Sequence, residues 1–260
     1  MRQTIAALTI LVLPVVAHSQ EPPEIRAFDL NTISELGQEI YRVDKYAAYA
    51  TDILFRQQLN LAEYQVRGWV VTEVDRIPLV TFVGEYEEEL RGLFEVRPES
   101  ELPEQFKIVV GRELSSEERA KFAARETASA ATLDYCSNSY NTVVLPDPTS
   151  DSWLVYLLAA TDQPGLVLAG GHYRFTISSD GMSVQNVDRL SRSCLTLDKH
   201  GADVPEGATP VMMFMTHIVS DTPVETHVFL SLLHDMDFAI ATENDVIWKV
   251  SGEQIGQLER

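Results

Sequence analysis

The densest apolar stretch of the sequence, Val211 to Val250, places the strongest constraint on the fold. Its first part is apolar on both alternating faces, and a strand with two apolar faces belongs inside a layered structure. Turn-forming residues then alternate with apolar runs. The stretch divides into four predicted strands: Val211 to Val219, Val224 to Leu233, Asp237 to Thr242 and Val246 to Val250. We therefore predict an antiparallel meander at this end of the chain.

A long helix is predicted near the start of the chain. Apolar residues recur at spacings of three and four from Ile33 to Leu54, which lays one apolar stripe along a helix. Thr32 and Glu35 form a capping box at its start. The period then changes to that of strands, and Asp75 with Arg76 predicts the turn of a hairpin.

The middle of the chain begins with a second helix and then becomes rich in strands. Ser115 and Glu118 form a capping box, and alanines dominate the apolar face that follows, up to about Thr132. Trp153 to Ala160 is apolar without alternation and suits a strand buried on both faces. Leu166 to Ser178 is predicted as one strand, followed by a hairpin turn and a returning strand. The predicted class is α+β, with a mainly antiparallel β-sheet of meander and hairpins in the C-terminal part.

The first residues of the chain predict a secretory signal peptide. Arg2 precedes an apolar run from Ile5 to Ala17, and Ala17 and Ser19 are small residues that suit a cleavage site. We expect three regions: a signal peptide at 1–19, an N-terminal α+β subdomain at 20–107 and a β-rich domain at 108–260. The expected location is the periplasm or the extracellular space. No membrane anchor is expected, since no later stretch suits a membrane span.

Two cysteines, Cys136 and Cys194, are present in the chain. In an oxidising compartment an isolated pair in a secreted chain more often forms a disulfide than a metal or catalytic site. The sequence therefore predicts a Cys136–Cys194 bridge, which also agrees with secretion.

The chain is acidic, with a formal net charge of −19 at pH 7. Such a chain repels nucleic-acid phosphates and anionic lipid headgroups, whereas a basic protein is allowed as a partner. The acidic run Glu85 and Glu87 to Glu89 is interpreted as a solvated surface.

Residues that could carry chemistry gather around the last apolar stretch. Glu225 and His227 share a face if their segment is extended, and an odd-numbered turn would place His217 beside His227. Two imidazoles and a carboxylate could then hold zinc as a metal site with one open position. The alternative is a core histidine and an ordinary surface pair. Gly170, Gly171 and His172 are interpreted as an exposed strand end or the rim of a ligand site.

The half of the chain from Arg125 onward resembles a group of uncharacterised secreted bacterial proteins. The motifs that carry the resemblance are SNSYNTVVLPDP, DSWLVYLLAAT, GGHYRF, SDG, SCLTL and THIVSDTPVETHVFLSL. No activity is assigned to that group, so the resemblance implies no function. A fainter similarity to JAB/MPN-type metalloproteases rests on Thr216 and His217. The second histidine expected there is Val219, which removes a metal ligand.

Two functional hypotheses follow. The first is a secreted, non-enzymatic binding protein, inhibitor-like, with a basic protein as its partner and no cofactor. The second is a metal-dependent hydrolase that uses zinc bound by His217, Glu225 and His227. A structural component of the cell envelope is a third and plainer possibility.

Overall fold

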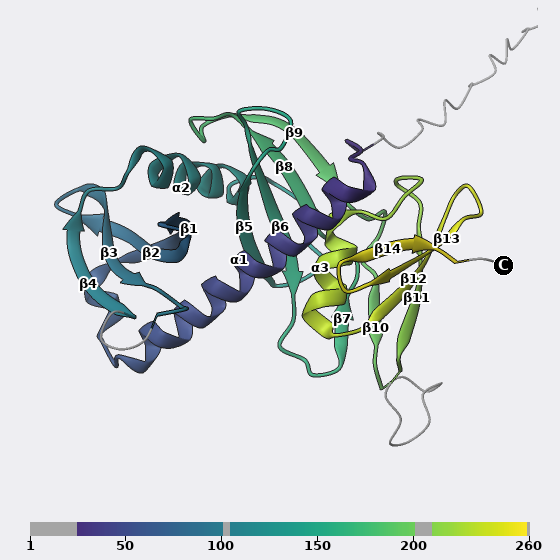
Figure 1. Ribbon diagram of the computed structural model, residues 1–260. Coiled ribbons are helices and arrows are strands. Elements are labelled where there is room, and N and C mark those ends of the chain that lie inside the picture. Colours follow the sequence, from purple (N-terminus) through teal and green to yellow (C-terminus); the bar gives the residue numbers. More distant parts are fainter. Residues whose placement is uncertain (1–24, 101–104, 201–209, 259–260) are drawn as a thin grey trace, which may run out of the picture.

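The computed structural model describes residues 25–100, 105–200 and 210–258. The predicted signal peptide, residues 1–19, lies outside the described residues. Figure 1 shows three four-stranded sheets in a row, with the first helix crossing all of them. Most strand pairs are antiparallel, so the predicted α+β class is confirmed. None of the helices in the described ranges has the length and apolar character needed to cross a bilayer.

The first unit is a long helix followed by an antiparallel meander. Helix α1, Leu30–Arg56, has 27 residues and is about 40 Å long. Asp29 caps it by accepting hydrogen bonds from the backbone N–H groups of Asn31 and Thr32. The helix therefore starts before the predicted capping box. After a short 3₁₀ turn the sheet follows in sequence order: β1 (Val66–Val74), β2 (Ile77–Tyr86), β3 (Glu89–Val96) and β4 (Phe106–Arg112).

The predicted hairpin between the first two strands is confirmed. Asp75 and Arg76 form its turn with φ angles of 55° and 66°, the left-handed backbone that a tight two-residue hairpin needs. The sheet packs against the C-terminal half of α1, where Ala50, Ile53 and Leu54 are buried. The domain boundary predicted at 107–108 falls inside β4, so the first sheet continues to Arg112.

The second unit repeats the plan of a helix followed by four antiparallel strands. Helix α2, Ser116–Ser129, begins with the predicted capping box of Ser115 and Glu118. Its sheet has the order β5 (Ser139–Pro146), β6 (Trp153–Ala160), β8 (Tyr173–Ile177) and β9 (Val184–Arg189). Strand β6 is buried on both faces as predicted: Leu154, Tyr156 and Leu158 face α1, and Val155 and Leu157 face α2.

The segment from 166 to 178 was predicted as one strand, and that prediction is wrong. It forms β7 (Leu166–Leu168), which pairs with β10 (Thr196–Asp198), and then β8 in the second sheet. The chain bends between them at Gly170 and Gly171. Gly171 has a φ of +86°, and a side chain there would lie 2.4 Å from Cys136 Cβ. The predicted Cys136–Cys194 disulfide is confirmed and packs against this bend.

The last unit departs most from the prediction. Its sheet contains β11 (Met212–His217), β12 (Asp237–Thr242), β13 (Ile247–Ser251) and β14 (Gln254–Gln257). The segment predicted as the second strand is instead helix α3, Glu225–His234. Strands β11 and β12 consequently run parallel, and only β12, β13 and β14 form an antiparallel meander.

The reason for the error is that α3 is buried on all sides over its first two turns. All residues from Glu225 to Ser231 are buried, because the helix lies between α1 and the last sheet. A short segment that is apolar on every face cannot be assigned to helix or strand from periodicity. The parallel pair β11 and β12 also requires a crossover connection, which α3 provides.

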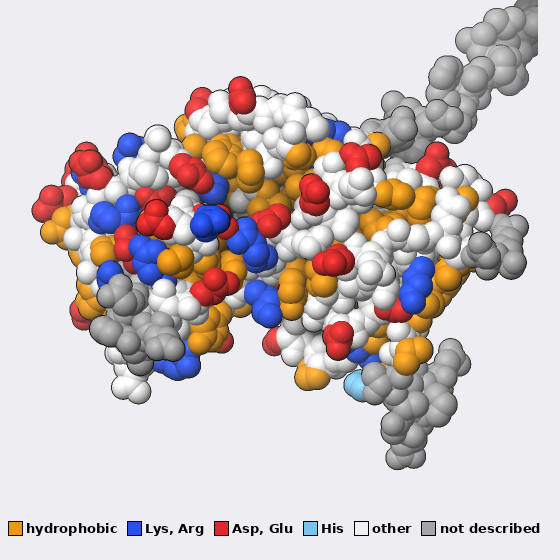
Figure 2. All heavy atoms as spheres, viewed as in Figure 1, with side chains coloured by type: hydrophobic (Ala, Val, Ile, Leu, Met, Phe, Trp, Pro, Cys, Tyr) orange, Lys and Arg blue, Asp and Glu red, His pale blue; other side chains and the backbone are white. Residues whose placement is uncertain are grey.

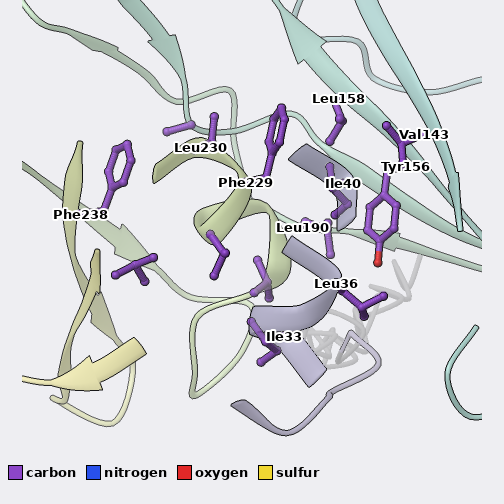
Figure 3. Packing of buried hydrophobic residues seen from close by; sticks show 14 of the residues in the cluster. Ile33, Leu36, Ile40, Val143, Tyr156, Leu158, Leu190, Phe229, Leu230 and Phe238 are labelled. Atoms are coloured by element: carbon purple, nitrogen blue, oxygen red, sulfur yellow. The ribbon is translucent and has the colours of Figure 1, made fainter. Parts of the chain in front are cut away.

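One large core joins the second and last units around α1. Figure 3 shows side chains from α1 (Ile33, Leu36, Ile40), α3 (Phe229, Leu230) and both sheets meeting between the layers. The same helix also contributes to the core under the first sheet. Because α1 belongs to both cores, the regions predicted at 20–107 and 108–260 share one continuous helix.

Candidate functional site

The predicted site residues His217 and His227 do come together, although by a helix and not by a hairpin. Their rings meet edge to face with centroids 4.7 Å apart. Ser220 Oγ donates to the carbonyl of Thr222 at 2.7 Å and therefore accepts the 2.8 Å bond from His217 Nε2. The backbone N–H of Val224 donates to His227 Nδ1 at 3.0 Å. These bonds suit two neutral imidazoles.

Burial keeps both of these rings neutral. It lowers the pKa of His217 to about 4. The pKa of His227 falls well below its ordinary value, first through burial and then through the neighbouring His217 and His172. A charged imidazole would lose hydration here without gaining a carboxylate partner.

Glu225 does not face the two histidines. Its Oε1 accepts a 2.7 Å hydrogen bond from Arg174 Nη1. The Nε and Nη2 atoms of the same guanidinium donate to Asp188 Oδ2 at 2.9 and 2.6 Å. Arg174 and Glu225 each have about 1% of their side chains exposed. We call Arg174, Asp188, Glu225 and the adjacent Tyr156 the Arg174 cluster. Burial, and next the charge of Glu225, raise the pKa of Tyr156 well above its ordinary value.

The start of the described chain joins the Arg174 cluster. The backbone carbonyl of Arg26 accepts a hydrogen bond from the guanidinium of Arg174. The guanidinium of Arg26 in turn donates to both carboxylate oxygens of Asp147, at 2.7 and 2.8 Å. The guanidinium carbons of Arg26 and Arg174 each lie 4.8 Å from the ring centre of Phe28. The cluster therefore ties the segment before α1, the second sheet and α3 together.

This arrangement does not fit the predicted zinc site. Glu225 neutralises a buried guanidinium, and His227 Nδ1 already accepts a backbone bond. No group of three or more His, Cys, Asp or Glu side chains that could hold a metal ion occurs in the described part of the chain. The hydrolase hypothesis thus loses the ligand set on which it rested. The chemistry of the cluster is that of a buried ion-pair network that holds elements in place, in which Glu225 Oε2 and the Tyr156 hydroxyl have no hydrogen-bond partner among the described residues.

The interpretation of His172 as an exposed residue is wrong. It is 1% exposed, accepts a bond from the N–H of Ala159 at Nδ1 and contacts the carbonyl of Leu168 at Nε2. Burial lowers its pKa to about 4. The bend at Gly170 and Gly171 turns the ring inward, so His172 ties β6 to the end of β7.

An open hollow of about 830 Å³ lies beside α2. We call it the α2 hollow. It lies between α2, strand β3 and the turn that joins β8 to β9. Its apolar lining is formed by Leu90, Leu114, Ala120, Phe122, Ala123 and Met182. Met182 and Leu90 are 68% and 40% exposed, so apolar surface stands open to solvent.

Acidic side chains lie beside the α2 hollow at one turn, and two more lie in its lining. The β2–β3 turn brings Glu85, Glu87, Glu88 and Glu89 to the strand that carries Leu90. Glu126 and Asp180 lie in the wall itself. Among the described residues, Glu87 and Glu88 make no ion pair, whereas Arg67 in the wall is paired with Glu85 and Glu126 at 2.8 and 3.3 Å. Arg119 also lines the hollow, and Arg91 pairs with Glu89, so the charges near the hollow partly cancel and the negative excess lies at Glu87 and Glu88 on the β2–β3 turn.

The sequence contains signals for this hollow, but they do not identify it. The alanine face of α2 is visible from periodicity, since small side chains leave space beside a helix. The acidic run at Glu85 to Glu89 is also visible, but such a run by itself indicates plain solvated surface. What sequence alone does not show is that strand β3 and the β8–β9 turn, far apart in the chain, both line the hollow beside α2.

Comparisons with known proteins add no identity to this site. The chain matches no protein-family model, and no significant match was found among curated proteins or solved structures.

Proposed function

We propose that this protein is a secreted, non-enzymatic binding protein whose partner is a basic protein, held at the α2 hollow. The observation that carries the proposal is an open apolar hollow with an acidic turn, Glu87 and Glu88, at its rim. The Cys136–Cys194 disulfide supports an extracytoplasmic location, because such bridges persist in oxidising compartments.

The lining of the hollow suits an apolar anchor. Ligand sites in proteins commonly enclose about 300–1,000 Å³, and the α2 hollow lies in that range at about 830 Å³. Binding energy at protein interfaces concentrates in a few large side chains that fill such pockets. Met182, after β8, and Leu90, on β3, both line the hollow and can contact such an anchor.

The rim suits basic groups beside that anchor. Glu87 and Glu88 are exposed at the tip of the β2–β3 turn, where Lys or Arg side chains of a partner can reach them. Charge complementarity of this kind mainly raises the association rate and selects the partner. The overall net charge of −19 adds a long-range attraction for basic proteins.

The test uses a defined probe: an amphipathic peptide of Leu and Lys residues labelled with a fluorophore. Its affinity is measured by fluorescence anisotropy at low and high salt. We expect binding that weakens with salt, and roughly tenfold weaker binding to a Leu90→Ser/Met182→Ser variant. The matched control is Val184→Ser, since Val184 is 44% exposed on β9 but does not line the hollow.

Three outcomes would overturn the proposal. The first is that the Leu/Lys peptide does not bind. The second is that an uncharged Leu/Gln peptide binds as tightly as the Leu/Lys peptide. The third is that Val184→Ser lowers the affinity as much as Leu90→Ser/Met182→Ser. Circular dichroism of each variant verifies that the fold is intact.

A further inference from the structure

A small cavity of about 10 Å³ lies where the first and second units meet. We call it the junction cavity. Its apolar walls belong to α1, β1 and β5, and its polar lining is formed by Lys121 and Arg125 of α2 and Thr142 of β5. Two cations and a hydroxyl group therefore converge on one small space between apolar walls.

The side chain of Arg125 is nearly buried, and its charge is poorly balanced. Its guanidinium carbon lies 4.6 Å from the ring centre of Trp69. Gly68 leaves room for it, since a Cβ there would lie 2.3 Å from Arg125 Nη1. The side chain is 14% exposed, and its Nε is buried without a hydrogen-bond partner among the described residues. Within the same residues its one acceptor is Glu126, which is 39% exposed and 3.5 Å away.

The other deeply buried arginine of the molecule shows what Arg125 lacks. Arg174 donates to Asp188 and Glu225 at distances of 2.6 to 2.9 Å. Buried charges in proteins are normally paired in this way, and a buried polar atom without a partner calls for a bound ion or water. Burial also lowers the pKa of Arg125, and the charge of Glu126 opposes this only in part. A negative charge in the junction cavity would balance this guanidinium.

The remaining polar groups of the cavity are also able to donate. The Lys121 ammonium has three N–H donors, and two of them are used by Glu117 at 2.8 Å and the carbonyl of Val71 at 3.0 Å. The hydroxyl of Thr142 makes no hydrogen bond in the ranges that the structure describes, and it can rotate toward a ligand. Because the cations can only donate, the cavity favours an anion.

The acidic character of the chain does not prevent anion binding here. The net charge of −19 repels anions at long range, but salt screens that field over about 10 Å. Figure 2 shows Lys and Arg side chains gathered near the middle of the face that α1 crosses, with Asp and Glu side chains among them. Close contacts with buried donors are screened much less than the field of distant charges. The local donors therefore decide what the cavity binds.

We propose that the junction cavity binds one chloride ion, held by Arg125, Lys121 and Thr142. A cavity of about 10 Å³ admits one water-sized sphere, so a carboxylate or a phosphate is too large. The flexible side chain of Lys121 can move by the small extra amount that chloride needs. A water molecule would fit as well but would leave the charge of Arg125 unbalanced.

The bound ion would link α2 to β5 beside β1, and so join the first and second units. An ion that binds the folded chain alone also stabilises that chain against unfolding. This inference goes beyond the proposed function, because it concerns a different site and a different class of ligand.

The line width of the chloride NMR signal tests the proposal on the whole mature protein, at constant ionic strength set with sodium acetate. We expect saturable broadening that bromide reverses by competition. Arg125→Gln should lower the chloride affinity at least tenfold, and Thr142→Val, which keeps charge and volume, roughly fivefold. The matched control is Arg76→Gln, which removes the same charge from an exposed hairpin turn.

The proposal is overturned if the native protein gives no saturable broadening, because the cavity then holds water only. It is also overturned if acetate displaces chloride as well as bromide does, or if Arg76→Gln lowers the affinity as much as Arg125→Gln. Circular dichroism verifies each fold. Should Arg125→Gln fail to fold, an unchanged affinity in Thr142→Val overturns the proposal. Failure of the α2 hollow as a peptide site leaves the chloride measurement unaffected, so the two proposals fail separately.

Discussion

The Arg174 cluster and the rim of the α2 hollow are both rich in charge, yet they differ in almost every physical respect. In the cluster, Arg174, Asp188 and Glu225 are nearly inaccessible and pair with one another. At the rim, Glu87 and Glu88 are exposed beside open apolar surface. The residues whose types suggest chemistry thus hold the core together, while the surface that we propose for binding is formed by residues that suggest no chemistry.

The largest expected effect is a loss of unfolding free energy at acidic pH, caused by the buried histidines. Folding lowers the pKa of His172 and His217 from 6.5 to about 4. Between those values the unfolded chain binds protons that the folded chain does not, so the free energy of unfolding falls as the pH is lowered. The full loss is about 3 kcal/mol for each histidine.

Urea unfolding at a series of pH values from 7 to 5 measures the first part of this loss, about 2 kcal/mol for each histidine. His217→Gln should flatten the dependence, because Gln can donate to Ser220 but does not titrate. Stability that stays constant from pH 7 to 5 in the native chain would contradict the account. The carboxyls of Glu118 and Asp147, whose pKa values Arg112 and Arg26 lower to about 2 against the effect of burial, lose their contribution only below about pH 4.5.

The next largest effect is expected from breaking the Arg174 cluster. Arg174→Met leaves Asp188 and Glu225 buried without a cation, which costs about 3–5 kcal/mol of unfolding free energy. Arg67→Met, in an exposed ion pair with Glu85 at the rim, should cost no more than about 1 kcal/mol. Thermal and urea unfolding compare the two. Similar losses of unfolding free energy in both variants would contradict the distinction between the buried Arg174 cluster and the exposed ion pair.

Much of the fold follows from local signals in the sequence. The stripe from Ile33 to Leu54 identifies α1, the capping box at Ser115 identifies the start of α2, and the Asp75–Arg76 turn identifies a hairpin. Each of these depends on contacts a few residues apart. The disulfide was predictable from residue count and compartment.

The errors arise where tertiary structure decides. Helix α3 is buried on every face over its first two turns because α1 and the last sheet cover it, so its periodicity carries no information. The change from strand to helix also turns Glu225 toward Arg174, and the expected ligand set with His217 and His227 does not form. The bend at Gly171 depends on close approach to the disulfide, which no local pattern reveals.

The smallest expected effect on stability is at the rim. Glu87→Gln and Glu88→Gln should change the free energy of unfolding by no more than about 0.5 kcal/mol, because both side chains are exposed. The same two variants should slow association of the Leu/Lys peptide in stopped-flow measurements. Glu243→Gln, an exposed carboxylate on the turn after β12, is the control. A large change in the free energy of unfolding would mean that these exposed side chains stabilise the fold, as the buried residues do.

Hydrogen–deuterium exchange with and without the Leu/Lys peptide tests the central claim most directly, because it maps the contact surface without altering the protein. We predict slower exchange in the segments that surround the α2 hollow, namely 85–91, 114–127 and 179–183, and no change around the Arg174 cluster. Protection confined to other segments, or none at saturating peptide, would contradict the claim that the α2 hollow is the binding site.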